Sequence, residues 1–149
     1  MEKLFVNKSI AVNATASRVW DALTKPENTV VWAAEFSSGG PRFHIESDWQ
    51  PGSAVLWKAE DGVVIVEGNV TAVEPEKMLR FTVFDTRSER PKVSPEDGIT
   101  FELSEQNKKT TLHVLHGDFG VMENGKKYYE ASAATWDRVL PKIKSIAEN

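Results

Sequence analysis

Residues 126–149 read KKYYEASAATWDRVLPKIKSIAEN, and the pattern of apolar residues in them is the strongest indication of the fold class. Large and small apolar side chains recur in it at intervals of three and four, the spacing of one face of an α-helix. They are Tyr129, Ala133, Trp136, Leu140, Ile143 and Ala147. The pattern predicts a long amphipathic C-terminal helix that must bury this face against another element. Pro141 is expected to bend or interrupt its last turns, because the proline ring clashes with the preceding turn.

The chain before this helix is mostly extended. Alternation of apolar and polar residues predicts strands over residues 4–13, 42–47, 53–60, 63–74, 78–86, 98–104 and 110–116. Pro51-Gly52 and Asp61-Gly62 are turn sequences between neighbouring strands, and a longer loop follows at residues 87–97. Two short helices are expected after the first strand. Thr15 or Asn13 would cap the first of them, and Pro26 would begin the second.

This order of elements predicts an α+β fold with one domain over residues 1–149. We expect a curved antiparallel sheet of about six to seven strands wrapped round the long C-terminal helix, because each element needs the other to bury its apolar side. Two short helices would follow the first strand.

Composition excludes several classes of protein. The chain has 149 residues, 40% of them hydrophobic, a formal net charge of −4 and no cysteine. These values fit one folded domain and exclude disulfides and thiolate catalysis. An acidic balance argues against nucleic acid, which requires clustered Lys and Arg. No stretch has the length of a membrane span, and residues 1–5 are not a signal peptide. We therefore expect a cytoplasmic protein.

Four stretches in this order resemble the family of homologues of the activator of heat-shock-protein ATPase, within the START/birch-allergen superfamily of helix-grip domains. They are residues 19–27 (VWDALTKPE), 52–57, 68–75 and 110–117. The resemblance implies a cavity between sheet and helix, which superfamily members use for lipids, polyketide-like and other aromatic molecules. One branch of the family stimulates a chaperone ATPase, usually within a longer protein, which implies a role in the stress response.

Strand alternation predicts which side chains face the helix. Even positions of residues 63–74 are apolar or small, and the inward set is Val64, Val66, Gly68, Val70 and Ala72, then Leu79, Phe81, Val83, Ile99, Phe101, Leu103, Leu112, Val114 and His116. Gly68 and Ala133 are small residues opposite rings, which favours a cavity there.

The candidate ligand-binding site combines these positions with aromatic residues of the helices. Its predicted lining is Trp32, Phe36, Phe43, Trp57, Val66, Phe81, Phe101, His116, Tyr129, Ala133 and Trp136. Most of these would supply shape and burial, while His116 and Tyr129 would orient a ligand through polar groups. The alternative for each ring is ordinary core packing, and for His116 a hydrogen bond to a nearby backbone group.

No catalytic, metal or cofactor site is expected. No serine stands in a Gly-x-Ser-x-Gly turn. His113 and His116 would point to opposite faces of one strand, so they cannot share a zinc ion. Gly39-Gly40 precedes a strand rather than a helix, which argues against a phosphate site.

Three hypotheses for function follow. The first is binding of a lipid-, polyketide- or flavonoid-like molecule. The second is a protein-interaction module with a chaperone or homodimer partner, and the third is an enzyme of cyclase or hydratase type. The last would need an inward carboxylate or a pair of histidines.

Overall fold

The structure, a computed structural model, describes residues 3–37, 42–85, 98–121 and 125–149. Strand β1 (Val6–Val12) leads into helices α1 (Ala16–Thr24) and α2 (Pro26–Ala33) and the 3-10 turn η1 (Ala34–Ser37). The remaining elements are β2 (Phe43–Glu46), β3 (Ala54–Ala59), β4 (Val64–Glu74), β5 (Met78–Thr82), β6 (Phe84–Asp85), β7 (Gly98–Gln106), β8 (Lys109–Gly117), η2 (Phe119–Val121) and α3 (Gly125–Glu148).

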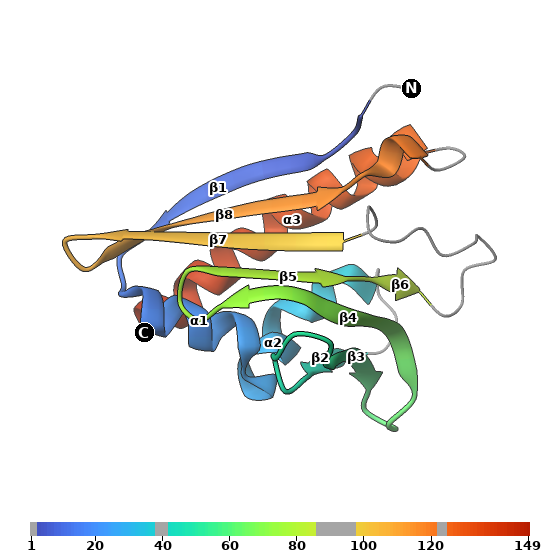
Figure 1. Cartoon of the computed structure of the whole chain (residues 1–149), viewed down its shortest axis with the longest axis horizontal. Coiled ribbons are helices and arrows are strands. Elements are labelled where there is room, and N and C mark those ends of the chain that lie inside the picture. The colour runs from blue at the N-terminus through green and yellow to red at the C-terminus, as the bar shows by residue number, and fades with distance from the viewer. Residues whose placement is uncertain (1–2, 38–41, 86–97, 122–124) are drawn as a thin grey trace.

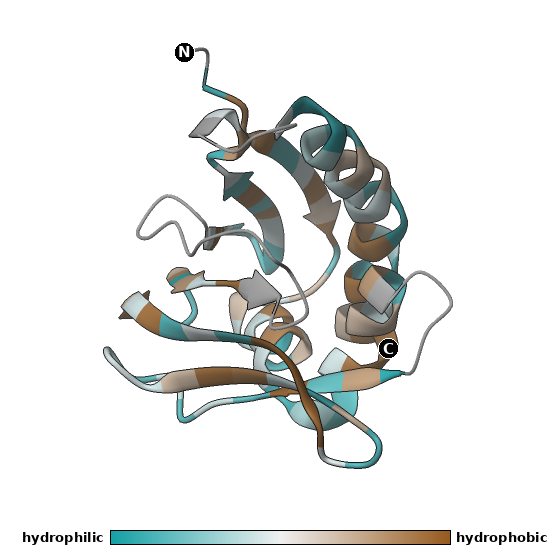
Figure 2. Cartoon of the chain, turned by 90° about the vertical axis from the view of Figure 1, so that its right-hand side faces the viewer, coloured by the Kyte–Doolittle hydropathy of each residue, from teal (hydrophilic) through white to brown (hydrophobic). Residues whose placement is uncertain are grey.

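The strands form one curled antiparallel sheet in the order β1-β8-β7-β5-β4-β3-β2, with the short β6 beside β4. In Figure 1, α3 runs behind β7 and β8, and α1 and α2 lie near its C-terminal end. Figure 2 shows α3 standing across the open side of the curl, so that sheet and helix cover one another's apolar faces. The predicted α+β helix-grip architecture is confirmed.

One predicted strand is divided. Residues 78–86 were expected to form a single strand, but β5 pairs with the end of β4 whereas β6 pairs with Val66 and Glu67 farther back. The strand breaks at Val83, between the two pairing regions. Thr86 and the expected loop at residues 87–97 lie outside the described residues.

Two bulges change which side chains of β4 face inward. Register shifts occur between the pairs Trp57↔Val66 and Lys58↔Val64, and between Val70↔Phe81 and Ala72↔Arg80. Side chains of directly paired residues share a face, so Val64 lies on the outer side with Lys58, and Ala72 with Arg80. The prediction that both point inward is wrong, because each extra residue shifts the alternation by one.

The turn sequences behave as expected. Gly62 has a φ of 87°, and the carboxylate of Asp61 accepts a hydrogen bond of 3.0 Å from the Val63 amide. Between β7 and β8 the turn is tighter than predicted. Gln106 pairs with Lys109, and the two residues between them, Asn107 and Lys108, have positive φ values of 55° and 63°. A two-residue turn of this kind matches the twist of the strands, which therefore extend beyond the predicted ends.

The helix signals are confirmed at the start of α1 and α2. Thr15 caps α1 by accepting a hydrogen bond of 3.4 Å from the Arg18 amide, and Pro26 opens α2. The expected interruption of α3 does not occur, since the helix continues through Pro141 to Glu148. Ile143 and Ala147, both buried, anchor its last turns in the core.

Candidate ligand-binding site

A connected set of rings fills the space between the sheet and α3. We call it the aromatic cluster, and its members, each in contact with at least one other, are Trp32, Phe36, Phe43, Trp49, Trp57, Phe81, Phe101, His116, Phe119, Tyr129 and Trp136. Sheet, α2, η1 and α3 all contribute to it. The cluster therefore joins every layer of the fold.

Three fully buried rings form the centre of the cluster. Trp32 of α2 lies 6.3 Å from Phe101 of β7 and 6.4 Å from Trp136 of α3, measured between ring centroids. Phe101 and Trp136 are 5.8 Å apart in an edge-to-face arrangement. Edge-to-face pairs add stability beyond the area they bury, about 0.5–1.5 kcal/mol each. This centre is packed core.

The structure brings together the ring residues predicted for the site. The two predicted residues without rings, Val66 and Ala133, lie beside them. Val66 is paired with Trp57 across β3 and β4, and Ala133 lies one helical turn before Trp136. Sequence reasoning missed Trp49, which packs on Phe81, and Phe119, which packs on His116 and Tyr129. Both lie outside strands and the long helix, where alternation gives no signal.

Burial changes along α3. From Trp136 onward the inner face is closed, with Val139, Leu140 and Ile143 all buried. Before Trp136 the inner residues Tyr129 and Ala133 are only partly buried. The cluster is thus closed toward the C-terminal half of α3 and reaches solvent along the N-terminal half.

Two further residues of the cluster region are partly exposed in the same way, Phe36 and Val66. The ring centroid of Phe36 lies 5.2 Å from that of Trp136 and 5.5 Å from that of Trp57. Phe36 therefore connects Trp136, which is one helical turn from Ala133, with Trp57, which is paired with Val66. We call Phe36, Val66, Tyr129 and Ala133 the exposed edge of the cluster. Here apolar side chains from η1, β4 and α3 are continuous with buried rings.

Gly68 does not leave room for a ligand. A Cβ atom built on it would lie 1.8 Å from the carbonyl oxygen of Thr82. The backbone of β5 thus occupies the space that the missing side chain vacates. The sequence argument that this glycine favours a cavity is wrong, because glycine serves here for close approach of two strands.

His116 is a buried polar member of the cluster. Its Nδ1 accepts a hydrogen bond of 3.2 Å from Nε1 of Trp136, and its ring lies 5.0 Å from that of Phe119. The indole of Trp136 thus supplies the partner of Nδ1. His113 bonds to Asn7 of β1, away from the cluster.

Trp57, unlike His116, has a buried polar atom without a hydrogen bond to the residues that the structure describes. Within the described part of the chain, its Nε1 is the buried side-chain nitrogen or oxygen that has no hydrogen-bond partner, although the residue is only 3% exposed. A buried donor left without an acceptor costs about 1–3 kcal/mol. Native proteins rarely leave such a group without a hydrogen-bond partner.

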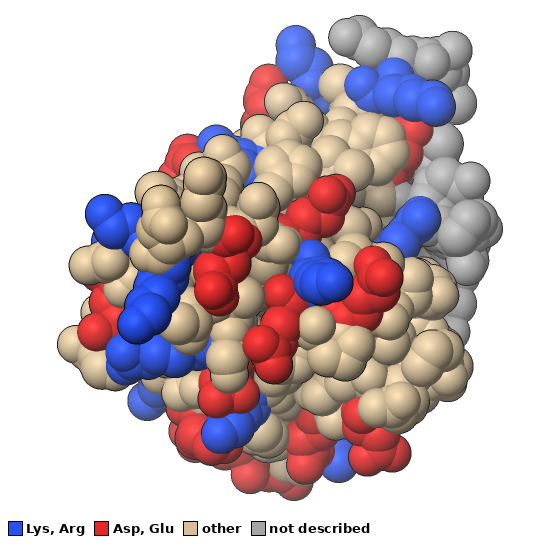
Figure 3. Space-filling model, turned by 60° about the vertical axis from the view of Figure 1, so that its left-hand side comes forward, with Lys and Arg blue, Asp and Glu red and all other residues tan. Residues whose placement is uncertain are grey.

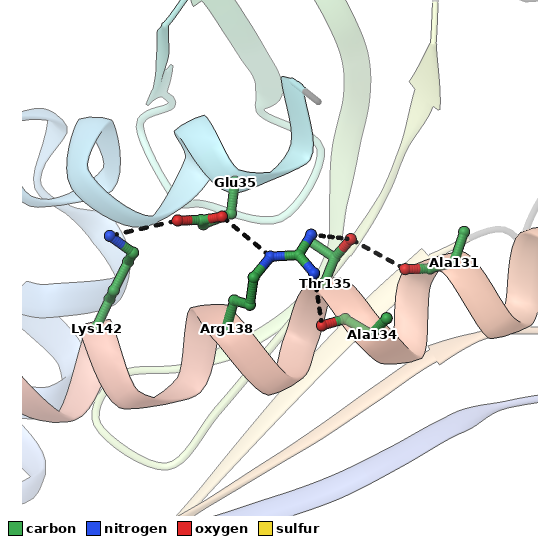
Figure 4. Close-up of polar contacts among 6 residues, drawn as sticks. All are labelled: Glu35, Ala131, Ala134, Thr135, Arg138 and Lys142. Atoms are coloured by element: carbon green, nitrogen blue, oxygen red, sulfur yellow. Dashed lines mark hydrogen bonds and ion pairs between the residues drawn. The ribbon is translucent and has the colours of Figure 1, made fainter. Parts of the chain in front are cut away.

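An ion-pair group outside the cluster fixes η1 on α3. The carboxylate of Glu35 lies 3.2 Å from Nε of Arg138 and 3.3 Å from Nζ of Lys142 (Figure 4). The hydrogen bond from Arg138 is the main reason that the pKa of Glu35 is lowered. Because Phe36 follows directly, this contact also holds one residue of the exposed edge in place. Sequence alone gave no signal for it.

Charged side chains of both signs are mixed on one face of the molecule (Figure 3). On the face shown in Figure 3, Lys and Arg alternate with Asp and Glu, and neither sign gathers into a large patch. In the part of the chain that the structure describes, none of the helices combines the length and the apolar character needed to cross a bilayer.

A curled antiparallel sheet closed by a long C-terminal helix is the architecture of the helix-grip class of domain. Residues 13–148 match the family described as Activator of Hsp90 ATPase homolog 1-like protein, and the chain belongs to that family. Among curated proteins, none matches the sequence.

Solved structures share the fold over nearly the whole chain. ChR145 from Cytophaga hutchinsonii is 24% identical, with a TM-score of 0.71 over 100% of this chain and 97% of its own. The Aha1 dimer from Colwellia psychrerythraea is 17% identical, with a TM-score of 0.72 over 97% and 96%. DynU16, a protein of the dynemicin biosynthetic locus, is 21% identical, with a TM-score of 0.70 over 99% of this chain and 48% of its own. At these identities the likeness shows the fold alone.

Proposed function

We propose that this domain binds a small hydrophobic or aromatic molecule at the exposed edge of the aromatic cluster. The observation that supports this is the change in burial along α3, where apolar residues continuous with the core remain in contact with water. A ligand that covered Phe36, Val66, Tyr129 and Ala133 would remove that apolar surface from water, which is the main driving force for such binding. Pockets for small molecules are largely apolar with few polar groups.

The fold relatives are consistent with this proposal. DynU16, which shares this fold, is a protein in the dynemicin biosynthetic locus, and this supports the proposal that the fold can serve small-molecule binding. For the present chain, the lipid-, polyketide- or flavonoid-like classes remain the candidates to be tested.

We propose binding rather than turnover. The buried polar or charged residues of the described chain are Thr24, Thr29, Thr110, His116 and Asp118. Of these, His116 alone belongs to the aromatic cluster, and Nδ1 of His116 already accepts from Trp136. Acid–base catalysis would require positioned proton donors and acceptors next to the substrate. The exposed edge contributes only the hydroxyl of Tyr129.

The test is titration of the protein with flavone, lauric acid and cholesterol, followed by tryptophan fluorescence and melting temperature. Trp57 and Trp136 both contact Phe36, so a bound molecule is expected to change the emission of the protein. A ligand present at about one hundred times its Kd would stabilise the fold by about 2.7 kcal/mol and raise Tm. If none of the three classes changes either signal, the proposal is wrong.

Substitutions of two neighbouring alanines of α3 test where the ligand binds. Ala133 is partly buried on the inner face, whereas Ala134 is exposed. Ala133→Phe should fill the exposed edge and weaken ligand binding by about tenfold or more, or about 1.4 kcal/mol. Ala134→Phe, the matched control, should bind as the parent does. Equal binding by both variants would place the ligand elsewhere.

A second candidate function is binding to a protein. The name of the family and that of one fold relative, an Aha1 dimer, support it. Sedimentation of the chain at increasing concentration tests self-association, and stimulation of an Hsp90-type ATPase tests a chaperone role. A monomer that leaves the ATPase unchanged would exclude both.

A further inference from the structure

The three buried tryptophans of the aromatic cluster differ in what their indole N–H groups do. Nε1 of Trp32 donates to the carbonyl oxygen of Ala22 at 2.9 Å, and Nε1 of Trp136 donates to His116 at 3.2 Å. Nε1 of Trp57 is buried to a similar degree and has no acceptor among the described residues. One donor of the three is therefore buried without a hydrogen bond to any described residue.

The rings around Trp57 do not supply the missing acceptor. Trp32 and Phe36 meet it edge-to-face at 6.3 Å and 5.5 Å, and Phe43 lies 5.7 Å away. Aromatic faces are weak acceptors compared with oxygen. The side chain itself is held firmly, since Trp57 lies in the middle of β3 and is paired with Ile45 and Val66 on either side. A fixed donor in apolar surroundings is well suited to recognise a single acceptor atom.

The position of Trp57 connects this donor to the exposed edge. Two of its neighbours, Phe36 by ring contact and Val66 by strand pairing, belong to that edge. A molecule lying against them would therefore contact two direct neighbours of Trp57. This inference therefore rests on the proposed function and adds the chemistry of the ligand to it.

We infer that Trp57 is the group that orients the ligand, and that the ligand is a neutral aromatic ketone whose oxygen accepts from Nε1. An anionic acceptor does not fit, because a charge moved among these rings would lose its hydration without gaining a counter-charge. A pure hydrocarbon does not fit either, because it would leave the donor unsatisfied. Trp57 thereby takes the orienting role that sequence reasoning assigned to His116 and Tyr129.

The experiment compares 9-fluorenone with fluorene, two molecules of nearly the same shape that differ in one carbonyl oxygen. Binding to the full chain is measured by tryptophan fluorescence and by two-dimensional ¹H–¹⁵N NMR of the indole N–H groups. The parent should bind fluorenone about tenfold more tightly than fluorene, a difference of about 1.4 kcal/mol. The Trp57 indole proton should move downfield with fluorenone and not with fluorene.

Trp57→Phe keeps a ring at the position and removes the donor. This variant should bind the two molecules equally. The matched control is Trp49→Phe, which also removes one indole N–H, here a donor to the carbonyl oxygen of Thr24 at 3.2 Å. It should keep the preference for fluorenone. If Trp57→Phe does not fold, the indole shift of the parent protein decides.

The outcomes separate this inference from the proposed function. Equal binding of fluorenone and fluorene to the parent, or a preference that survives in Trp57→Phe, would overturn the role of Trp57 while leaving ligand binding intact. Failure of both molecules and of the wider ligand panel would overturn the proposed function and this inference together.

Discussion

Nε1 of Trp136 donates a hydrogen bond of 3.2 Å to Nδ1 of His116, and this bond ties α3 to β8 inside the aromatic cluster. Because Nδ1 accepts, the proton of a neutral His116 must reside on Nε2. Helix α3 is therefore joined to β8, which pairs with both β1 and β7, by a hydrogen bond as well as by packing.

The two residues should depend on each other energetically. We expect Trp136→Phe and His116→Ala each to lower the free energy of unfolding, and the double variant to lose about 1 kcal/mol less than the sum. Urea denaturation of the four proteins measures this coupling. Strictly additive losses would show that the bond contributes nothing.

The Glu35 contact predicts a dependence on pH. Its folded-state pKa lies below the ordinary value of 4.5, chiefly because Arg138 donates to the carboxylate. Because the pKa is lowered in the folded state, the stabilisation by ionised Glu35 is complete above pH 4.5. It disappears as the pH falls through the pKa of the folded state. Glu35→Gln should cost about 0.5 kcal/mol at neutral pH and nothing in acid.

Two further measurements test the ion pair of Glu35, one at high salt concentration and one on a matched control variant. The cost of Glu35→Gln should shrink in about 1 M NaCl, because exposed ion pairs are screened. Glu130→Gln, on the exposed side of α3, should leave unfolding unchanged at either pH. A cost of Glu35→Gln that persisted in acid would mean that the charge is not its cause.

Gly68 is expected to be intolerant of any side chain. Gly68→Ala would place Cβ 1.8 Å from the Thr82 carbonyl oxygen, so β4 and β5 must move apart. We expect a loss of about 3 kcal/mol in unfolding free energy. Asn69→Ala, one residue along and exposed, should change it by less than about 0.5 kcal/mol. Tolerance of Gly68→Ala would show that the strands are not held this close.

Pro141 predicts a substitution that stabilises the protein. It is exposed within α3, so its ring contributes little packing while it removes one helical hydrogen bond. Pro141→Ala should raise the free energy of unfolding by about 1–2 kcal/mol, somewhat less than the full helix preference for Ala. Thermal unfolding measures the rise in Tm. Ser145→Ala, also exposed on α3, should give only a few tenths of a kcal/mol.

Alternation over β7 and β8 correctly placed Phe101, Leu103, Leu112, Val114 and His116 inside, because regular antiparallel strands keep a period of two. On β4, alternation wrongly predicted that Val64 and Ala72 face inward. Each lies next to a bulge, and a bulge is decided by how neighbouring strands bend together rather than by local composition. The division of residues 78–86 into β5 and β6 has the same origin.

Hydrophobic periodicity along the chain is enough to predict the long helix, the antiparallel strands and most of the rings between them, because it fixes which face of each element is buried. What each polar atom contacts there depends on how these elements pack in three dimensions. The bond between Trp136 and His116, the contact of Glu35 with Arg138 and the isolated donor of Trp57 all depend on the relative placement of residues far apart in the chain. Hydrogen bonds depend on distances and angles of a few tenths of an ångström and a few tens of degrees, which no spacing along a sequence specifies.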